Sequence, residues 1–139
     1  GGKIAPPTGD YLDDRPSGPH EGIDIILGTA DDKWHTAPGT PVYSEDNGVV
    51  IDCTKKSGAP GGYTIWIKSD QNALAPEEDL FYIHVAPLSI LSKGDHIVRG
   101  ELIGYISGEY NWHLHFQIGE KHKTKSPYLF FEKIGKEDE

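Results

Sequence analysis

The chain has very few sulfur-containing residues. Its 139 residues include a single cysteine, Cys53, and no methionine. One cysteine excludes an internal disulfide, and the apolar run that contains it, GVVIDC, predicts a small buried thiol. Because the chain begins with GGK and contains no methionine, we expect a mature fragment or an excised domain.

Positive charge and long apolar runs are also scarce. The chain has 13 Lys and Arg against 22 Asp and Glu, which gives a formal net charge of −9. Binding to a phosphate backbone requires a basic surface, so we expect no nucleic-acid partner. The mainly apolar segment IDIIL, like every apolar run in the sequence, is far shorter than the roughly 20 residues that a membrane-spanning helix needs, so we expect no membrane span.

Glycine and proline are abundant, with 17 and 10 residues, which favours short elements joined by tight turns and excludes a helical bundle. Short runs rich in β-branched and aromatic residues alternate with turn-forming segments. This pattern predicts an all-β, antiparallel domain of about eight short strands, within residues 22–27, 42–44, 48–53, 63–68, 80–85, 97–98, 102–106 and 112–118. We expect one domain over residues 1–139, with a loop-rich N-terminal segment (1–19) and a C-terminal extension (120–139) that ends in a mobile acidic tail.

Two histidines share one face of the last predicted strand, WHLHFQI. A period of two places Trp112, Leu114, Phe116 and Ile118 on one face, and His113, His115 and Gln117 on the other. Residues two apart on a strand are separated by about 6.6 Å, so both imidazoles could address one small site. This spacing suits one metal ligand and one neighbouring base.

A second candidate pair, His20 and Asp24, lies in GPHEGIDI. Both side chains can reach one ion only if the chain bends between them, and Gly22 could supply the unusual backbone angles of such a bend. The segment HEGID also differs from an HExxH zinc motif only in its last residue, but that motif requires a helix. Gly22 and the β-branched isoleucines disfavour a helix, so we expect Glu21 to be a solvated side chain.

A further histidine, His84, lies in the predicted strand LFYIHV. Alternation places Phe81, Ile83 and Val85 on one face and Tyr82 and His84 on the other. A single strand histidine is usually structural, but together with the other four residues His84 becomes a candidate for a third imidazole near a metal. We expect the remaining histidines to lie on the surface: His35, His96 and His122.

Five segments of the sequence resemble motifs of the lysostaphin/LytM-type zinc endopeptidases, which act on bacterial cell-wall peptides. They are HEGIDI, APGTPVYSEDNGVV, FYIHV, LSKGDHIVRGELIG and WHLHFQI, and they occur in the order of that family. The resemblance covers about residues 19–118 and implies a LytM-like β-roll with long loops around a groove. In that family a longer Gly/Ser/Thr-rich loop usually precedes the HxH motif, whereas here only SGEYN separates Ile106 from Trp112.

The resemblance also implies roles for individual residues. His20, Asp24 and His115 would be the ligands of a Zn²⁺ ion, and His84 and His113 would be the catalytic pair. The implied activity is hydrolysis of peptide bonds in the cross-links or stem peptides of peptidoglycan. We therefore expect a monomeric enzyme whose substrate is a peptidoglycan peptide. It would act outside the cell, in the periplasm or in the cell wall, or would belong to a phage as a virion or lysis protein.

Two other classes of protein compete with this interpretation. His113 and His115 followed by Glu120 match half of a cupin metal signature, but the 19 residues after Glu120 are too few for the second histidine motif. A catalytically silent, peptidase-like module that binds a wall peptide or a protein partner is the stronger alternative. Relatives that lose activity generally lose ligands or catalytic histidines, and all five residues are present here.

Overall fold

The structure is a computed structural model that describes residues 3–4, 12, 14–15, 18–19, 22–26, 39–55, 63–107, 114–119 and 123–127. Within these ranges the regular elements are β-strands paired antiparallel, which confirms the all-β class. No helix in the described part is long and apolar enough to cross a membrane.

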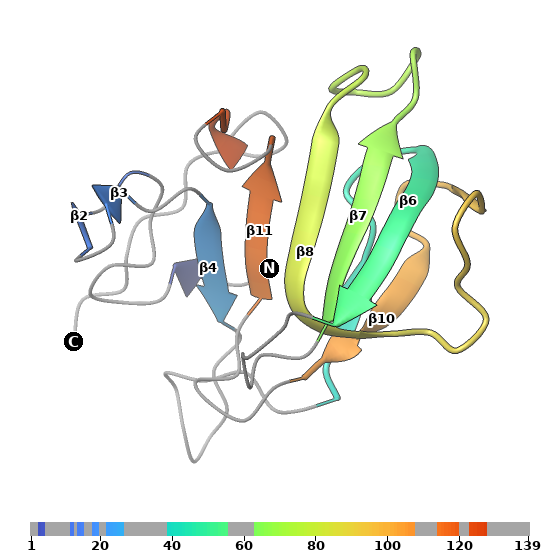
Figure 1. Cartoon of the computed structure of the whole chain (residues 1–139), viewed down its shortest axis with the longest axis horizontal. Helices are drawn as coiled ribbons and strands as arrows, with labels where there is room; N and C mark the ends of the chain where they lie inside the picture. The colour runs from blue at the N-terminus through green and yellow to red at the C-terminus, as the bar shows by residue number, and fades with distance from the viewer. Residues whose placement is uncertain are drawn as a thin grey trace.

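Nine of the strands form one curled sheet (Figure 1). Seven follow one another across it, in the order β1 (Lys3–Ile4), β4 (Ile23–Ile26), β11 (Leu114–Ile118), β8 (Asp79–Pro87), β7 (Tyr63–Ser69), β6 (Gly48–Lys55) and β9 (His96–Ile97). The strand β10 (Leu102–Ile106) pairs with both β5 (Pro41–Tyr43) and β8. A separate hairpin joins β2 (Asp14–Arg15) to β3 (Gly18–Pro19).

The eight strands predicted from the sequence correspond to β4 through β11, and the segment predicted to be loop-rich, residues 1–19, also contains the two-residue strands β1, β2 and β3. Lys3 and Ile4 pair with Ile26 and Ile25, so β1 covers the edge of β4. A two-residue ladder is too short to produce an alternating pattern, and nearby prolines prevent it from extending. The sequence therefore contains no periodic signal for β1, β2 or β3.

The core lies against one face of the sheet. Its side chains alternate along each long strand with more exposed ones, as expected for a half-buried sheet. Tyr82 and Phe116 pack together at its centre, with ring centroids 5.1 Å apart. The buried residues are Val42, Val50, Ile65, Ile67, Leu80, Tyr82, Val85, Ile97, Ile103, Ile106, Phe116 and Ile118. Cys53 packs against this cluster but is only half-buried, so the expected full burial of its thiol is not observed.

The sheet branches at His84. On one edge of β8, residues up to Ile83 pair with β11, whereas Val85 and the residues after it pair with β10. On the other edge, Tyr63 pairs with Val85 and Thr64 pairs with Ile83, so His84 is an extra residue in a β-bulge. Because a bulge shifts the alternation by one residue, Val85 faces the core with Tyr82, and the predicted grouping of Val85 with Ile83 is wrong.

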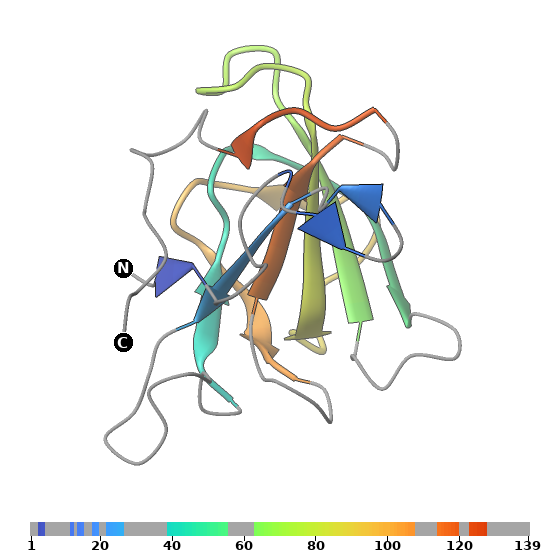
Figure 2. The same cartoon turned by 90° about the vertical axis from the view of Figure 1, so that its left-hand side faces the viewer.

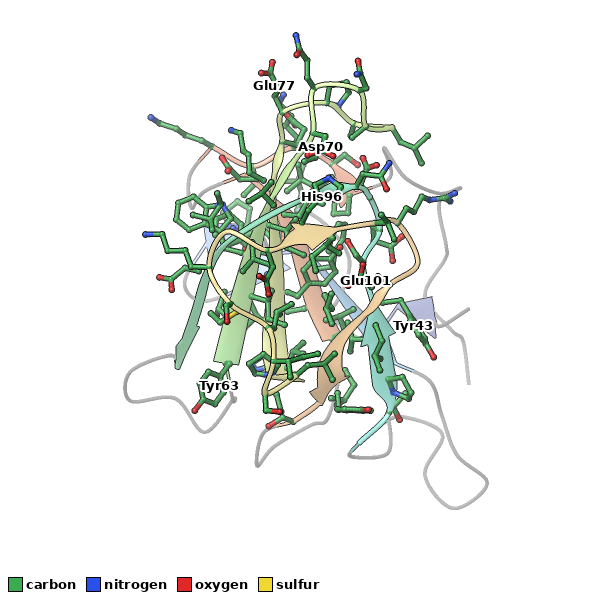
Figure 3. The ribbon with its side chains drawn as sticks, turned by 90° about the vertical axis from the view of Figure 1, so that its right-hand side faces the viewer. Tyr43, Tyr63, Asp70, Glu77, His96 and Glu101 are labelled. Atoms are coloured by element: carbon green, nitrogen blue, oxygen red, sulfur yellow. The ribbon has the colours of Figure 1, made fainter. Side chains whose placement is uncertain are left out.

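A buried carboxylate links two segments at one end of the sheet, the segment that precedes β6 and the segment between β7 and β8. Asp46 is fully buried and accepts hydrogen bonds from the backbone N–H groups of Asn47, Leu74 and Ala75. Nearby, Nε2 of the exposed His96 lies 2.7 Å from Oδ2 of Asp70, so the expected surface position of His96 is confirmed. Figure 3 shows Asp70 and His96 at this end, with Tyr63 at the opposite end.

Candidate metal centre

Three neighbouring strands bring predicted site residues together. The strand β11 lies between β4 and β8, and the views in Figures 1 and 2 both show β4 beside β11. In the ladder, His115 is paired with Asp24 on one side and with Ile83, the neighbour of His84, on the other. Paired residues share a face of the sheet, with Cα atoms about 4.5 to 5.5 Å apart. The fold thus places Asp24, His115 and the bulge within one small area.

The backbone at His84 adopts an uncommon conformation. Its φ is 70°, in the left-handed region that a few per cent of residues other than glycine enter, most often asparagine, aspartate and histidine. The carbonyl of His84 accepts a hydrogen bond from the backbone N–H of Ser107 at 2.8 Å, which fastens the bulge to the end of β10. Strained residues that are held by surrounding structure are concentrated at functional sites. The bulge therefore gives His84, a predicted site residue, a backbone conformation of the kind found at functional sites.

Gly22 lies directly against the imidazole of His115. A Cβ atom at Gly22 would be 2.4 Å from the carbonyl oxygen of Phe116 and 2.8 Å from Nε2 of His115. Any side chain would therefore push β11 away. The φ of Gly22 lies outside the left-handed region, so the expectation that it supplies unusual backbone angles is wrong. Its role is to permit this close approach.

The same ring nitrogen, Nε2, also contacts Gln117. Nε2 of His115 lies 2.9 Å from Oε1 of Gln117, and Nε2 of Gln117 donates to the carbonyl of Gly119 at 2.9 Å. Both His115 and Gln117 are half-buried on the predicted face, opposite the buried Phe116 and Ile118. The predicted alternation of the described part of this strand is therefore confirmed.

The face that carries His115 continues into an aromatic surface on β8 and β7. Gln117 is paired with Phe81, and Phe81 with Trp66. The two half-buried rings stack with centroids 5.4 Å apart, and the indole N–H of Trp66 donates to Asp79 at 2.9 Å. A fixed apolar surface of this kind can support an extended peptide beside the candidate site.

The residue types at the paired positions, Asp24 and His115, fit a zinc site. Zn²⁺ binds carboxylate oxygen and imidazole nitrogen. The described residues contain no group of three or more potential ligands, but His20 and His113 lie outside them. The five-residue site therefore stays a prediction, of which the structure places Asp24, His84 and His115.

Two contacts of His115 were not predicted from the sequence. Gln117 was placed on the correct face but was given no role, although the i, i+2 spacing on a strand brings the side chains of His115 and Gln117 into contact. Gly22 was noticed but for the wrong reason, because a close approach between β4 and β11 becomes visible only when their register is known.

Comparisons with known proteins show the family and the fold of this chain. Residues 18–127 match the family model described as Peptidase family M23. The chain is similar to LytU at 25% identity and a TM-score of 0.68, with 94% of this chain and 84% of that chain covered. It is similar to the catalytic domain of the antimicrobial peptidase lysostaphin from Staphylococcus simulans at 23% identity and a TM-score of 0.64, with 94% and 89% covered.

A third similar structure is a zinc-containing peptidase from Vibrio cholerae, at 21% identity and a TM-score of 0.59, with 97% of this chain and 36% of that chain covered. The chain spans half the length of the lysostaphin chain in its NMR solution structure. A search of curated protein sequences found no significant match. Because the family model covers most of the sequence, from residue 18 to residue 127, this chain belongs to peptidase family M23.

Proposed function

We propose that this chain is a zinc-dependent metalloendopeptidase that hydrolyses peptide bonds in the cross-links or stem peptides of bacterial peptidoglycan. The observation that carries the proposal is the position of His115 in the sheet. It is paired with Asp24 on one side and, on the other, with Ile83, which directly precedes the bulge at His84. Membership of peptidase family M23 supports the reaction class. The substrate follows from the resemblance of the sequence to cell-wall endopeptidases.

Three protein ligands are assigned to the metal: His20, Asp24 and His115. Two imidazoles and one carboxylate leave one zinc position open, as in catalytic rather than structural sites. When bound, zinc polarises the scissile carbonyl and lowers the pKa of a water molecule. The zinc-containing peptidase from Vibrio cholerae, which has a similar fold, makes zinc the first metal to test.

The two remaining histidines, His84 and His113, handle protons. One accepts a proton from the attacking water, and the other donates to the developing oxyanion or to the leaving amine. The bulge supports this role for His84, because it fixes that residue beside the strand that carries His115. Truncation of either histidine to alanine should lower kcat by about 100-fold or more, while zinc content stays unchanged.

The ligand assignment can be tested by zinc content. Asp24→Ala should lower zinc affinity by orders of magnitude, because it removes one of three ligands. Asp52→Ala is the matched control, since Asp52 is an exposed aspartate on β6, away from the paired β4 and β11. Full zinc occupancy in Asp24→Ala would show that the ligand assignment is wrong.

The substrate can be tested on a panel of purified walls with glycine-rich, alanine-containing and direct cross-links. The zinc-loaded protein should release free amines from at least one wall and should stop when a chelator is added. Release of reducing sugar in place of amine would indicate a glycosidase. No release by a zinc-loaded sample would favour the silent binding module. The expected setting, a monomer outside the cytoplasm or in a phage lysis apparatus, belongs to the same proposal.

A further inference from the structure

We infer that Gln117 is a positioning residue that fixes the tautomer of His115, so that Nε2 carries the proton and Nδ1 carries the lone pair. The inference rests on the proposed function only where it concerns zinc. Its core is a chain of two hydrogen bonds, from Nε2 of His115 to Oε1 of Gln117 and from Nε2 of Gln117 to the carbonyl of Gly119.

The last acceptor of these two hydrogen bonds, the carbonyl of Gly119, lies in a tight turn after β11. Gly119 has a φ of 91°, and a Cβ atom there would lie 2.5 Å from the carbonyl oxygen of Lys123. Its N–H donates to the carbonyl of Asp79 at 2.7 Å, and the backbone N–H of Lys125 donates to the carbonyl of Ile118 at 2.8 Å. The Gly119 carbonyl is therefore a fixed acceptor.

The direction of each hydrogen bond follows from the chemistry of these groups. A backbone carbonyl can only accept, so the amide nitrogen of Gln117 must face Gly119. The amide oxygen of Gln117 must then face His115, and because this oxygen also only accepts, Nε2 of His115 must donate. In a neutral imidazole with a proton on Nε2, the lone pair lies on Nδ1.

Gly22 lies against the same ring. A Cβ atom there would be 2.8 Å from Nε2 and 3.0 Å from Cε1 of His115, so the absence of a side chain at Gly22 leaves the imidazole room to contact Gln117. A zinc ligand must present a deprotonated nitrogen, and a hydrogen bond to its other nitrogen orients the ring and raises its basicity. Gln117 thus prepares Nδ1 of His115 for a metal before any metal arrives.

The first test is the tautomer of His115 in the metal-free full chain, measured from the ¹⁵N chemical shifts of its ring nitrogens. In the original protein we expect a proton on Nε2. Gln117→Leu removes the acceptor at similar size, so we expect a mixture of tautomers. Gln117→Glu keeps an acceptor for Nε2 but loses the donor to Gly119, so we expect it to restore the tautomer with a proton on Nε2.

The second test is zinc affinity, measured by competition with a chromophoric chelator. Gln117→Leu should weaken zinc binding by about 10- to 100-fold, the range for loss of a hydrogen bond to a ligand, whereas Gln117→Glu should recover most of that loss. Gln71→Leu is the matched control, because Gln71 lies exposed in the turn after β7, and it should leave both readouts unchanged.

A proton on Nδ1 of His115 in the metal-free original protein would overturn the inference, and this measurement depends on no variant. An unchanged tautomer and unchanged zinc affinity in Gln117→Leu would overturn it as well. Failure of the proposed function is distinguishable from both results. A chain that binds no zinc and releases no amine from any wall would refute the enzyme, while the ring nitrogens would still report on Gln117.

Discussion

Replacement of Gly22 by alanine tests whether the close approach of β4 to β11 shapes the candidate metal centre. The new Cβ atom would lie 2.4 Å from the carbonyl oxygen of Phe116 and 2.8 Å from Nε2 of His115, and ordinary contacts begin at 3.4 Å. The first distance must therefore grow by 1.0 Å (3.4 − 2.4) and the second by 0.6 Å (3.4 − 2.8). The first contact is with backbone, so a side-chain rotation cannot relieve it.

The required movement exceeds the tolerance of a catalytic site, which is about 0.5 Å. Overpacking of this kind costs about 1 to 3 kcal/mol of folding free energy. A displacement of about 1 Å can also lower the rate about 100-fold. We therefore expect Gly22→Ala to fold with reduced stability, to bind zinc more weakly, and to lose about 100-fold in kcat/KM on its best wall substrate.

Gly48→Ala separates the effect on the site from the effect on stability. A Cβ atom at Gly48 would lie 2.4 Å from the carbonyl oxygen of Lys68, at the end of β6 that pairs with β9. Urea unfolding should show similar destabilisation of both variants, whereas chelator competition should show weaker zinc binding only in Gly22→Ala. Equal zinc affinities in the two variants would refute the link between Gly22 and the site.

Three further predictions concern stability and reactivity. Asp46→Asn should lower the free energy of unfolding by about 1 to 3 kcal/mol in a urea titration, because the N–H group of either Leu74 or Ala75 loses its acceptor beside the buried Asp46 position. Burial raises the pKa of Glu45, so its stabilising contribution is present at acidic pH and is lost as the carboxyl ionises. Glu45→Gln should therefore gain stability relative to the original protein as the pH rises to neutrality, and a constant difference in unfolding free energy across pH would contradict this. Burial also raises the pKa of the Cys53 thiol, so alkylation followed by mass spectrometry should be slower in the native protein than in urea, and equal rates would refute it.

The sequence predicts the long strands well because their side chains alternate between core and surface. Each of the eight predicted runs corresponds to an observed strand, including the short β5 and β9. The pairing of Asp24 with His115 was not predictable from either strand alone, because register depends on contacts between segments about 90 residues apart.

The bulge at His84 shows what a local pattern cannot reveal. The run LFYIHV alternates regularly, yet the edge partner of β8 changes from β11 to β10 at this residue. The extra residue accommodates that change, and it depends on pairings with distant parts of the chain. The direction of the hydrogen bond between His115 and Gln117 was equally hidden, because it is set by a backbone carbonyl at Gly119.

The proposed peptidase activity is best tested by the release of free amines from purified peptidoglycan, with equal zinc loading of the original protein and His84→Ala. We expect chelator-sensitive amine release by the original protein and a rate at least about 100-fold lower in His84→Ala, because that variant lacks the proposed proton-transfer group. Absence of release from every wall, or equal rates for the two proteins, would contradict the proposal.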